Sequence, residues 1–229
     1  MNTRNRTPLV IAIVLVVVAI VAIAVVVLAG GDDDDPAGTE STDGGAGTSS
    51  TLPEIYAGEV LPITVEGTAL PALENPEDDA AVGLTAPVLV GQSFDGSAVT
   101  TASDGGPVMV VFLAHWCPHC NDEIPRLIGL EEEGRFPDDL KIVGVSTAVD
   151  PDRPNFPPSE WIVDKGWPWP IMADGVNTDT GFFAGAEAFG VNGFPFITVV
   201  GADGNVLGRW SGESAPDDFI AKLDAALAA

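Results

Sequence analysis

The chain has 229 residues and carries 34 acidic side chains against nine basic ones, so its formal net charge at pH 7 is −25. Such an acidic surface repels nucleic acid, and no basic patch offsets it, so nucleic-acid binding is excluded. The length is sufficient for one well-packed domain with extensions.

The first residues of the chain predict a membrane anchor. Residues 9–28 are all apolar, and as a helix they would be about 30 Å long, which matches the hydrocarbon core of a bilayer. Arg4 and Arg6 precede this segment and a run of aspartates follows it, so the positive-inside rule places residues 1–8 in the cytoplasm. A cleavable signal peptide is the alternative, although its apolar region is usually shorter. We expect an uncleaved, single-pass anchor in a bacterial cell membrane, with the rest of the chain extracytoplasmic.

Two further regions precede the domain. Residues 29–51 are rich in Asp, Gly, Ser and Thr and contain little to bury, which predicts a disordered acidic tether. Residues 52–85 predict an extended segment that docks in part on the domain, and a strand within residues 60–65 would be confined to a sheet edge by Pro62. The apolar side chains available for docking are Leu70, Leu73 and Val82.

From residue 86 onward, short apolar strands alternate with helices, which predicts one α/β domain over residues 86–229. A turn at Asp95-Gly96 joins the first two strands as a hairpin. The residues from Ser214 to Asp217 fit a capping box at the start of the last helix. The predicted strands are residues 87–90, 98–101, 108–113, 140–147, 170–173, 196–200 and 206–210, and the predicted helices are residues 121–130, 159–165, 180–189 and the C-terminal segment.

The third of these strands leads into a Cys-x-x-Cys motif. Residues 108–113 are an apolar, mostly β-branched run that predicts a fully buried strand, and Cys117 and Cys120 follow it at the start of a helix. This context favours a redox dithiol over half of a zinc site. At a helix N-terminus, unpaired N–H groups and the positive end of the dipole favour a thiolate at Cys117. The chain has two cysteines in total, so none is left for a structural disulfide.

The motif supports a family resemblance. Trp-Cys-Pro-His-Cys after a buried strand, with Gly193-Phe194-Pro195 before a later strand, resembles the thioredoxin superfamily. Glu123 and Pro125 are similar to the acid and proline of its membrane-anchored TlpA/ResA/DsbE branch. The resemblance covers about residues 86–229 and implies a thioredoxin-like α/β fold, a mixed sheet flanked by helices, behind the N-terminal transmembrane helix.

We expect Cys117 to be the attacking nucleophile and Cys120 the resolving thiol, because dithiol exchange passes through a mixed disulfide. A helix dipole supplies at most about 2 kcal/mol, whereas lowering a thiol pKa from about 8.5 to about 3.5 takes roughly 7 kcal/mol. The imidazole of His119 is therefore expected to help, and its Pro-His dipeptide is similar to that of DsbA-type oxidases, which implies an oxidising poise. Glu123, one turn after Cys120, predicts the opposite, because a carboxylate disfavours a thiolate and carries its proton. We expect His119 to prevail narrowly.

The resemblance also implies a substrate-binding edge. Pro195 would be the cis-proline that faces the dithiol, and Phe194 would contact the substrate backbone, while Trp116 is expected to shield the sulfur atoms. Val111 stands where the superfamily places a second buried acid. We expect His115 to be an exposed, neutral histidine. The tryptophans expected to pack in the core or in loops are Trp161, Trp167 and Trp169.

These features predict an extracytoplasmic thiol–disulfide oxidoreductase that uses a Cys117–Cys120 redox-active disulfide and needs no other cofactor and no metal. The partners implied are cysteine-containing extracytoplasmic proteins, with apocytochrome c as the substrate that the TlpA-like resemblance suggests, and a membrane redox partner. The alternative is a copper chaperone of the SCO type, although that class uses Cys-x-x-x-Cys and a distal histidine. A peroxiredoxin would need a Thr-x-x-Cys motif, and Ala114 stands at the position of that threonine.

Overall fold

A computed structural model describes residues 54–229 of the chain. The predicted anchor, the tether and the first residues of the docked segment lie outside the described residues. Over the part that is described, no helix is both long and apolar enough to cross a membrane.

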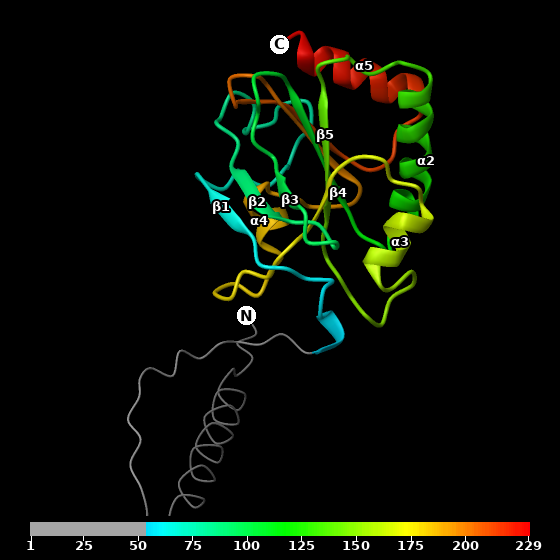
Figure 1. Cartoon of the computed structure of the whole chain (residues 1–229). Coiled ribbons are helices and arrows are strands. Elements are labelled where there is room, and N and C mark those ends of the chain that lie inside the picture. The colour runs from blue at the N-terminus through cyan, green and yellow to red at the C-terminus, as the bar shows by residue number, and fades with distance from the viewer. Residues whose placement is uncertain (1–53) are drawn as a thin grey trace, which may run out of the picture. The chain divides into compact units, whose positions relative to one another are not determined.

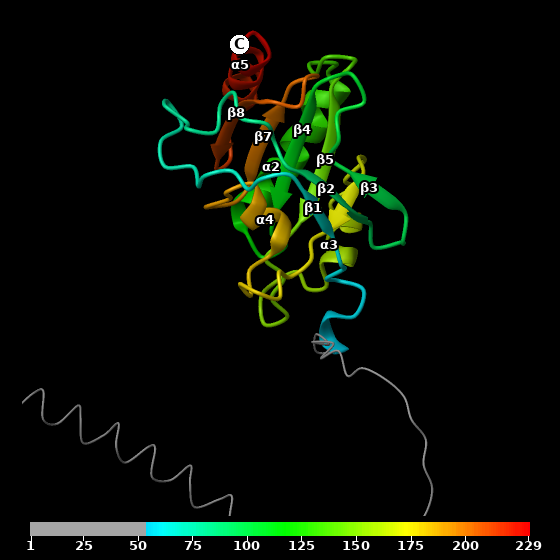
Figure 2. The same ribbon diagram turned by 90° about the vertical axis from the view of Figure 1, so that its left-hand side faces the viewer.

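The centre of the domain is a five-stranded mixed sheet in the order β6-β5-β4-β7-β8. Strands β4, β5 and β6 are parallel, whereas β7 is antiparallel to both β4 and β8. Figure 2 shows β4 in the middle, between β5 and β7. The five strands are Val108–Leu113 (β4), Lys141–Ser146 (β5), Ile171–Ala173 (β6), Phe196–Val200 (β7) and Val206–Ser211 (β8).

Helices cover both faces of this sheet, which confirms the predicted thioredoxin-like α/β fold. Helices α2, α3 and α5 pack on one face, and α4 packs on the other together with a small antiparallel sheet of order β1-β2-β3 (Figure 1). The helices are Pro118–Glu132 (α2), Pro158–Asp164 (α3), Ala184–Ala188 (α4) and Pro216–Leu227 (α5), after a short 3-10 turn at Glu54–Tyr56 (η1). The small sheet contains Thr64–Glu66 (β1), Val88–Gln92 (β2) and Ala98–Thr100 (β3).

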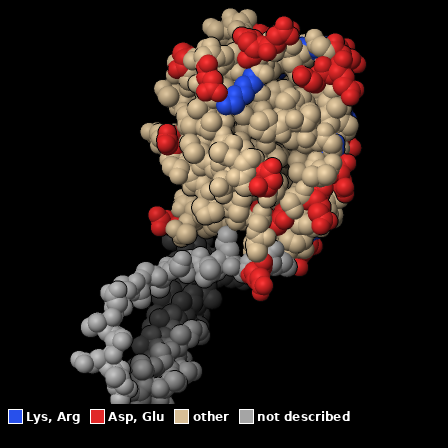
Figure 3. All heavy atoms as spheres, viewed as in Figure 1, with Lys and Arg blue, Asp and Glu red and all other residues tan. Residues whose placement is uncertain are grey.

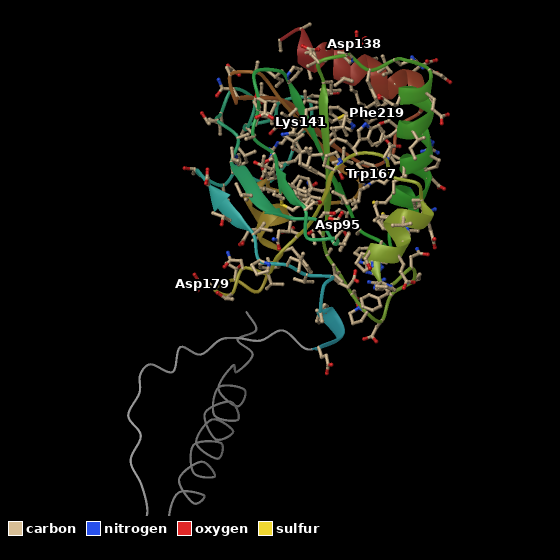
Figure 4. All side chains as sticks on the ribbon, in the orientation of Figure 1. Asp95, Asp138, Lys141, Trp167, Asp179 and Phe219 are labelled. Atoms are coloured by element: carbon tan, nitrogen blue, oxygen red, sulfur yellow. The ribbon has the colours of Figure 1, made fainter. Side chains whose placement is uncertain are left out.

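Strand β4 divides the core into two layers. Its side chains alternate, so Met109, Val111 and Leu113 pack against α2, α3 and α5, and the intervening residues pack against α4 and the small sheet. All six residues of β4 are fully buried, as the continuous apolar run predicted. Phe219 of α5 and the ring of Trp167 lie in the first layer (Figure 4). Because β4 is fixed in the core, the start of α2, which follows it in the chain, lies at one end of the sheet.

Residues 54–85 dock on the domain more firmly than the sequence indicated. Leu70 and Leu73 are buried, whereas Val82 is 49% exposed, so its predicted docking role is wrong. Ala81 is buried beside it, and Asp79 forms a fully buried ion pair with Arg209 of β8 at 2.5 Å. The guanidinium also donates to the carbonyl groups of Pro71 and Phe189.

Two helix predictions need correction. The predicted helix over residues 180–189 shortens to α4, because residues 176–183 form a loop closed by a bridge between Val176 and Phe183. The predicted capping box is wrong, because Ala215 rather than Ser214 occupies the N-cap of α5. The N–H of Ser214 is used elsewhere, as a donor to Glu123.

Candidate active site

The two cysteines lie where β4 passes into α2. Cys117 is the N-cap residue of α2, and Pro118 occupies the first helical position, where its missing N–H costs nothing. Cys120 lies in the first turn and is fully buried, whereas the residue Cys117 is 5% exposed. Both are free thiols, and Cys117 is the one that reaches the surface.

The two thiols differ strongly in acidity. The hydrogen bond from the Cys120 thiol lowers the pKa of Cys117 to about 6, with burial acting against it and the backbone N–H groups of Cys120 and His119 adding to it. Burial raises the pKa of Cys120, and the hydrogen bond to Cys117 raises it further. At neutral pH the pair therefore consists of one thiolate and one thiol, which is the asymmetry that disulfide exchange requires.

The imidazole of His119 contributes less to this asymmetry than expected. Its charge is the last of the causes that lower the pKa of Cys117, after the Cys120 thiol and the two backbone N–H groups. The side chain is 61% exposed, and its Nδ1 lies 3.2 Å from Oε1 of Glu213 in the loop between β8 and α5. His119 therefore acts on the thiolate mainly through its backbone.

Glu123 is a buried carboxyl group in the second turn of α2. Its Oε2 accepts the N–H of Ser214 at 3.2 Å and lies 3.5 Å from Nη1 of Arg126, while its buried Oε1 has no hydrogen-bond partner among the described residues. Burial raises the pKa of Glu123, and the charge of Glu123 contributes to the raised pKa of Cys120. The group can therefore hold a proton close to the buried thiol.

The loop before β7 lies against the dithiol. The Phe194–Pro195 peptide bond is cis, in agreement with the resemblance at this position. In its protonated form the Cys117 thiol donates a hydrogen bond to the carbonyl of Phe194, with sulfur and oxygen 3.5 Å apart. The ring of Phe194 packs edge-on against Trp116, with 5.9 Å between the ring centroids. The predicted substrate-contacting residues are thus brought together with Cys117.

Trp116 connects the motif to the loop that follows β5. Its indole N–H donates to the carbonyl of Ala148 at 2.7 Å, and the guanidinium of Arg153 stacks over its ring at 4.9 Å. The three tryptophans expected in the core or in loops pack as predicted. Trp161 is buried and donates to Asn121, and the ring centroids of Trp167 and Trp169 are 4.8 Å apart.

His115 is not exposed, which corrects its prediction. It is fully buried, its Nδ1–H donates to the carbonyl of Pro154 at 2.8 Å, and its Nε2 accepts the N–H of Asp150 at 3.2 Å. This assignment is one neutral tautomer, and burial lowers the pKa of His115, so the expected neutrality agrees with the structure. Asn155 donates to the backbone carbonyl of His115 at 2.8 Å, and both Asn155 and Ala148 adopt positive φ. His115 therefore fastens the loop of residues 148–157 beside the motif.

A cavity of about 430 Å³ opens next to Phe194. Thr147 and Ala148 line its end near the motif, and Leu70 and Phe182 line it from two other segments. No pattern in the sequence predicted this cavity, because its walls come from three stretches of the chain, residues 70–72, 147–148 and 182–194.

No cluster of three or more His, Cys, Asp and Glu side chains with metal-binding geometry is present in residues 54–229.

Comparisons with known proteins agree with this chemistry. The thiol:disulfide interchange protein HelX of Rhodobacter capsulatus is 30% identical over 157 residues, which are 67% of this chain and 81% of HelX. A thioredoxin-family thiol:disulfide interchange protein of Chlorobium tepidum matches with 27% identity and a TM-score of 0.49, over 65% of this chain and 99% of that structure. StoA of Bacillus subtilis matches with 17% identity and a TM-score of 0.47, over 62% and 98%. The AhpC/TSA family model matches residues 79–206, so the chain belongs to the AhpC/TSA family, and it is a thiol–disulfide oxidoreductase.

Proposed function

We propose that this oxidoreductase exchanges disulfides with cysteine-containing polypeptides outside the cytoplasm, with Cys117 as the nucleophile and Cys120 as the resolving thiol. The observation that carries the proposal is the contrast between the two thiols, since the pKa of Cys117 is lowered to about 6 and that of buried Cys120 is raised.

The exchange runs in two steps. The Cys117 thiolate attacks one sulfur of a substrate disulfide, forms a mixed disulfide and releases the other substrate sulfur as a thiolate. Cys120 then loses its proton and attacks the Cys117 sulfur, which releases the second substrate thiolate and leaves a Cys117–Cys120 disulfide. The substrate is reduced by two electrons and the dithiol is oxidised. The same steps in reverse oxidise a substrate dithiol.

Glu123 is the proton carrier in this proposal. Cys120 is fully buried and keeps its proton at neutral pH, so a base must accept that proton during the second step. Glu123 lies one helical turn away, and its unpartnered Oε1 is an atom on which a proton can reside. In the reverse direction the same carboxyl returns the proton to Cys120.

The substrate polypeptide would lie across Phe194, Pro195 and Trp116. The apolar cavity beside Phe194 offers room for a substrate side chain close to the reacting sulfur. The TlpA-like resemblance suggests apocytochrome c as one such substrate, and a second membrane protein would restore the redox state of the dithiol. The predicted anchor would place the domain on the extracytoplasmic side of the membrane. For the direction of exchange, we propose that the protein oxidises its substrates more readily than it reduces them.

Trapping of mixed disulfides tests the roles of the two cysteines. In Cys120→Ser, Cys117 attacks but nothing resolves the product, so covalent complexes with substrate proteins should accumulate. Cys117→Ser is the matched control and should trap none. The reverse pattern would contradict the assignment, and the absence of complexes in both variants would contradict exchange with protein disulfides.

Protease accessibility tests the location. Protease added to cells stripped of their wall should digest the C-terminal domain before the membrane is permeabilised. Survival of the domain until permeabilisation would contradict the extracytoplasmic placement.

A further inference from the structure

The loop between β8 and α5 contacts the start of α2 through two consecutive residues. Glu213 uses both carboxylate oxygens: Oε1 lies 3.2 Å from Nδ1 of His119, and Oε2 lies 2.5 Å from Nη1 of Arg126. The next residue, Ser214, donates its backbone N–H to Oε2 of Glu123. One loop therefore contacts both the exposed histidine of the motif and the buried carboxyl group.

Arg126 lies between two carboxyl groups and is closer to the outer one. The same Nη1 atom is 2.5 Å from Glu213 and 3.5 Å from Glu123. The charge of Arg126 is thus largely taken up by Glu213, which also presents a negative charge of its own to Glu123. Both effects favour the protonated form of Glu123, whereas Arg126 freed from Glu213 would favour the ionised form.

The other groups around Glu123 do not replace this arrangement. Within the described residues, Cys120 lies on the same helix and is neutral at pH 7 because its pKa is raised. From α5, Lys222 contacts the loop and donates to Oγ of Ser214 at 2.9 Å. On α2, Arg126 is the cation in contact with Glu123. The protonation of Glu123 therefore depends on whether Arg126 pairs with Glu213 or with Glu123.

We propose that Glu213 is a positioning residue for thiol–disulfide exchange, which pairs with Arg126 so that Glu123 remains able to accept a proton from Cys120 and return it. This inference rests on the proposed role of Glu123. Arg126 and Glu213 were not singled out by the sequence, because they lie 87 positions apart and neither belongs to the motif.

The alternative is that Glu213 and Arg126 form an ordinary surface ion pair with no role in exchange. Glu213 is about one-third exposed, and ion pairs at the surface contribute little to stability. In that case removal of Glu213 would alter the protonation of Glu123 no more than removal of an exposed acid on α2. Glu131 provides this comparison, because it is exposed near the far end of α2.

The test is a pH titration of the Glu123 carboxyl by NMR in the reduced full-length protein labelled with 13C-glutamate, with the resonance assigned by its loss in Glu123→Gln. Glu213→Gln should lower the pKa of Glu123 by about one unit, because Arg126 then pairs with it. Arg126→Gln should raise that pKa, and in the Arg126→Gln background the effect of Glu213→Gln should shrink. Glu131→Gln should leave the pKa of Glu123 in place.

Two results would overturn the inference. One is a Glu213→Gln shift no larger than that of Glu131→Gln, and the other is a shift in the same direction for Glu213→Gln and Arg126→Gln. A Glu213→Gln shift that disappears in a His119→Ala background would also overturn it, because the effect would then pass through the histidine. The titration requires no turnover, so its failure is distinguishable from failure of the proposed role of Glu123 as proton carrier, which is refuted if Glu123→Gln exchanges disulfides at the wild-type rate.

Discussion

The Cys120 thiol, rather than the His119 imidazole, should set the acidity of Cys117, and two single substitutions separate these contributions. The pKa of Cys117 is lowered from 9.0 to about 6, with the Cys120 thiol as the first cause. Three units correspond to about 4 kcal/mol. A hydrogen bond to a charged group contributes about 1.5–3 kcal/mol, so loss of this donor should raise the pKa of Cys117 by roughly 1–2 units. Cys120→Ala removes the donor, and Cys120→Ser replaces it with a hydroxyl donor of similar size.

Ultraviolet absorbance of the thiolate as a function of pH measures this difference directly. Each variant keeps Cys117 as its single cysteine, so the whole signal belongs to that residue. We expect a pKa near the wild-type value in Cys120→Ser and a raised one in Cys120→Ala. His119→Ala should raise the first thiol pKa less than Cys120→Ala does. Equal values in the two Cys120 variants, or a larger shift from His119→Ala, would refute the reasoning.

Three further substitutions test the scaffold around the site. Asp79→Ala leaves the buried guanidinium of Arg209 without its carboxylate and should lower the free energy of unfolding, measured in urea, by about 3–5 kcal/mol. A decrease below about 1 kcal/mol would contradict a stabilising role for this ion pair. Burial lowers the pKa of His115, so the unfolded chain binds the proton more tightly and stability should fall as the pH drops below about 6.5; His115→Gln should lose that slope. Asp174→Ala removes the acceptor of two α4 N–H groups and should lower the local stability of α4 by about 1–3 kcal/mol. Hydrogen exchange should then show faster amide exchange confined to α4.

The sequence was most informative where a feature is local. The complete burial of β4, the hairpin at Asp95-Gly96 and the placement of Cys117 at a helix start all follow from residues adjacent in the chain, and the structure agrees with each. The resemblance added the cis peptide before Pro195, which no local pattern fixes.

The failures arose where partners are distant in sequence. His115 was expected to be exposed, but the backbone groups of Pro154 and Asp150, 39 and 35 positions later, satisfy both of its ring nitrogens. Ser214 fits a capping pattern, yet its N–H is taken by Glu123 and the helix begins after Ala215. In both cases a hydrogen bond to a residue distant in sequence overrides the conformation or exposure that the local sequence favours.

The acidity of the surface is another property that composition does describe. Acidic side chains are spread over the face seen in Figure 3, and basic ones are few. Around the dithiol, however, the charges are paired, since Arg126 and His119 meet Glu213 and Arg153 pairs with Asp150. The net charge therefore says little about the field at the sulfur atoms, which the paired groups determine.

The direction of exchange can be bounded from the acidity of Cys117. At pH 7, a pKa of about 6 instead of 9.0 stabilises the reduced form about elevenfold, which is about 1.4 kcal/mol and raises the potential by at most about 30 mV. A thioredoxin near −270 mV and a strong oxidase near −120 mV are separated by about 150 mV, so the thiolate supplies roughly a fifth of that interval. The thiolate alone would therefore place the potential at about −240 mV at most. The oxidising lean predicts a value above about −200 mV, measured against glutathione mixtures with the full-length protein. A value below about −250 mV would refute the oxidising lean, and it would then be Glu123, as the carrier of the Cys120 proton, that adapts the site to reduction.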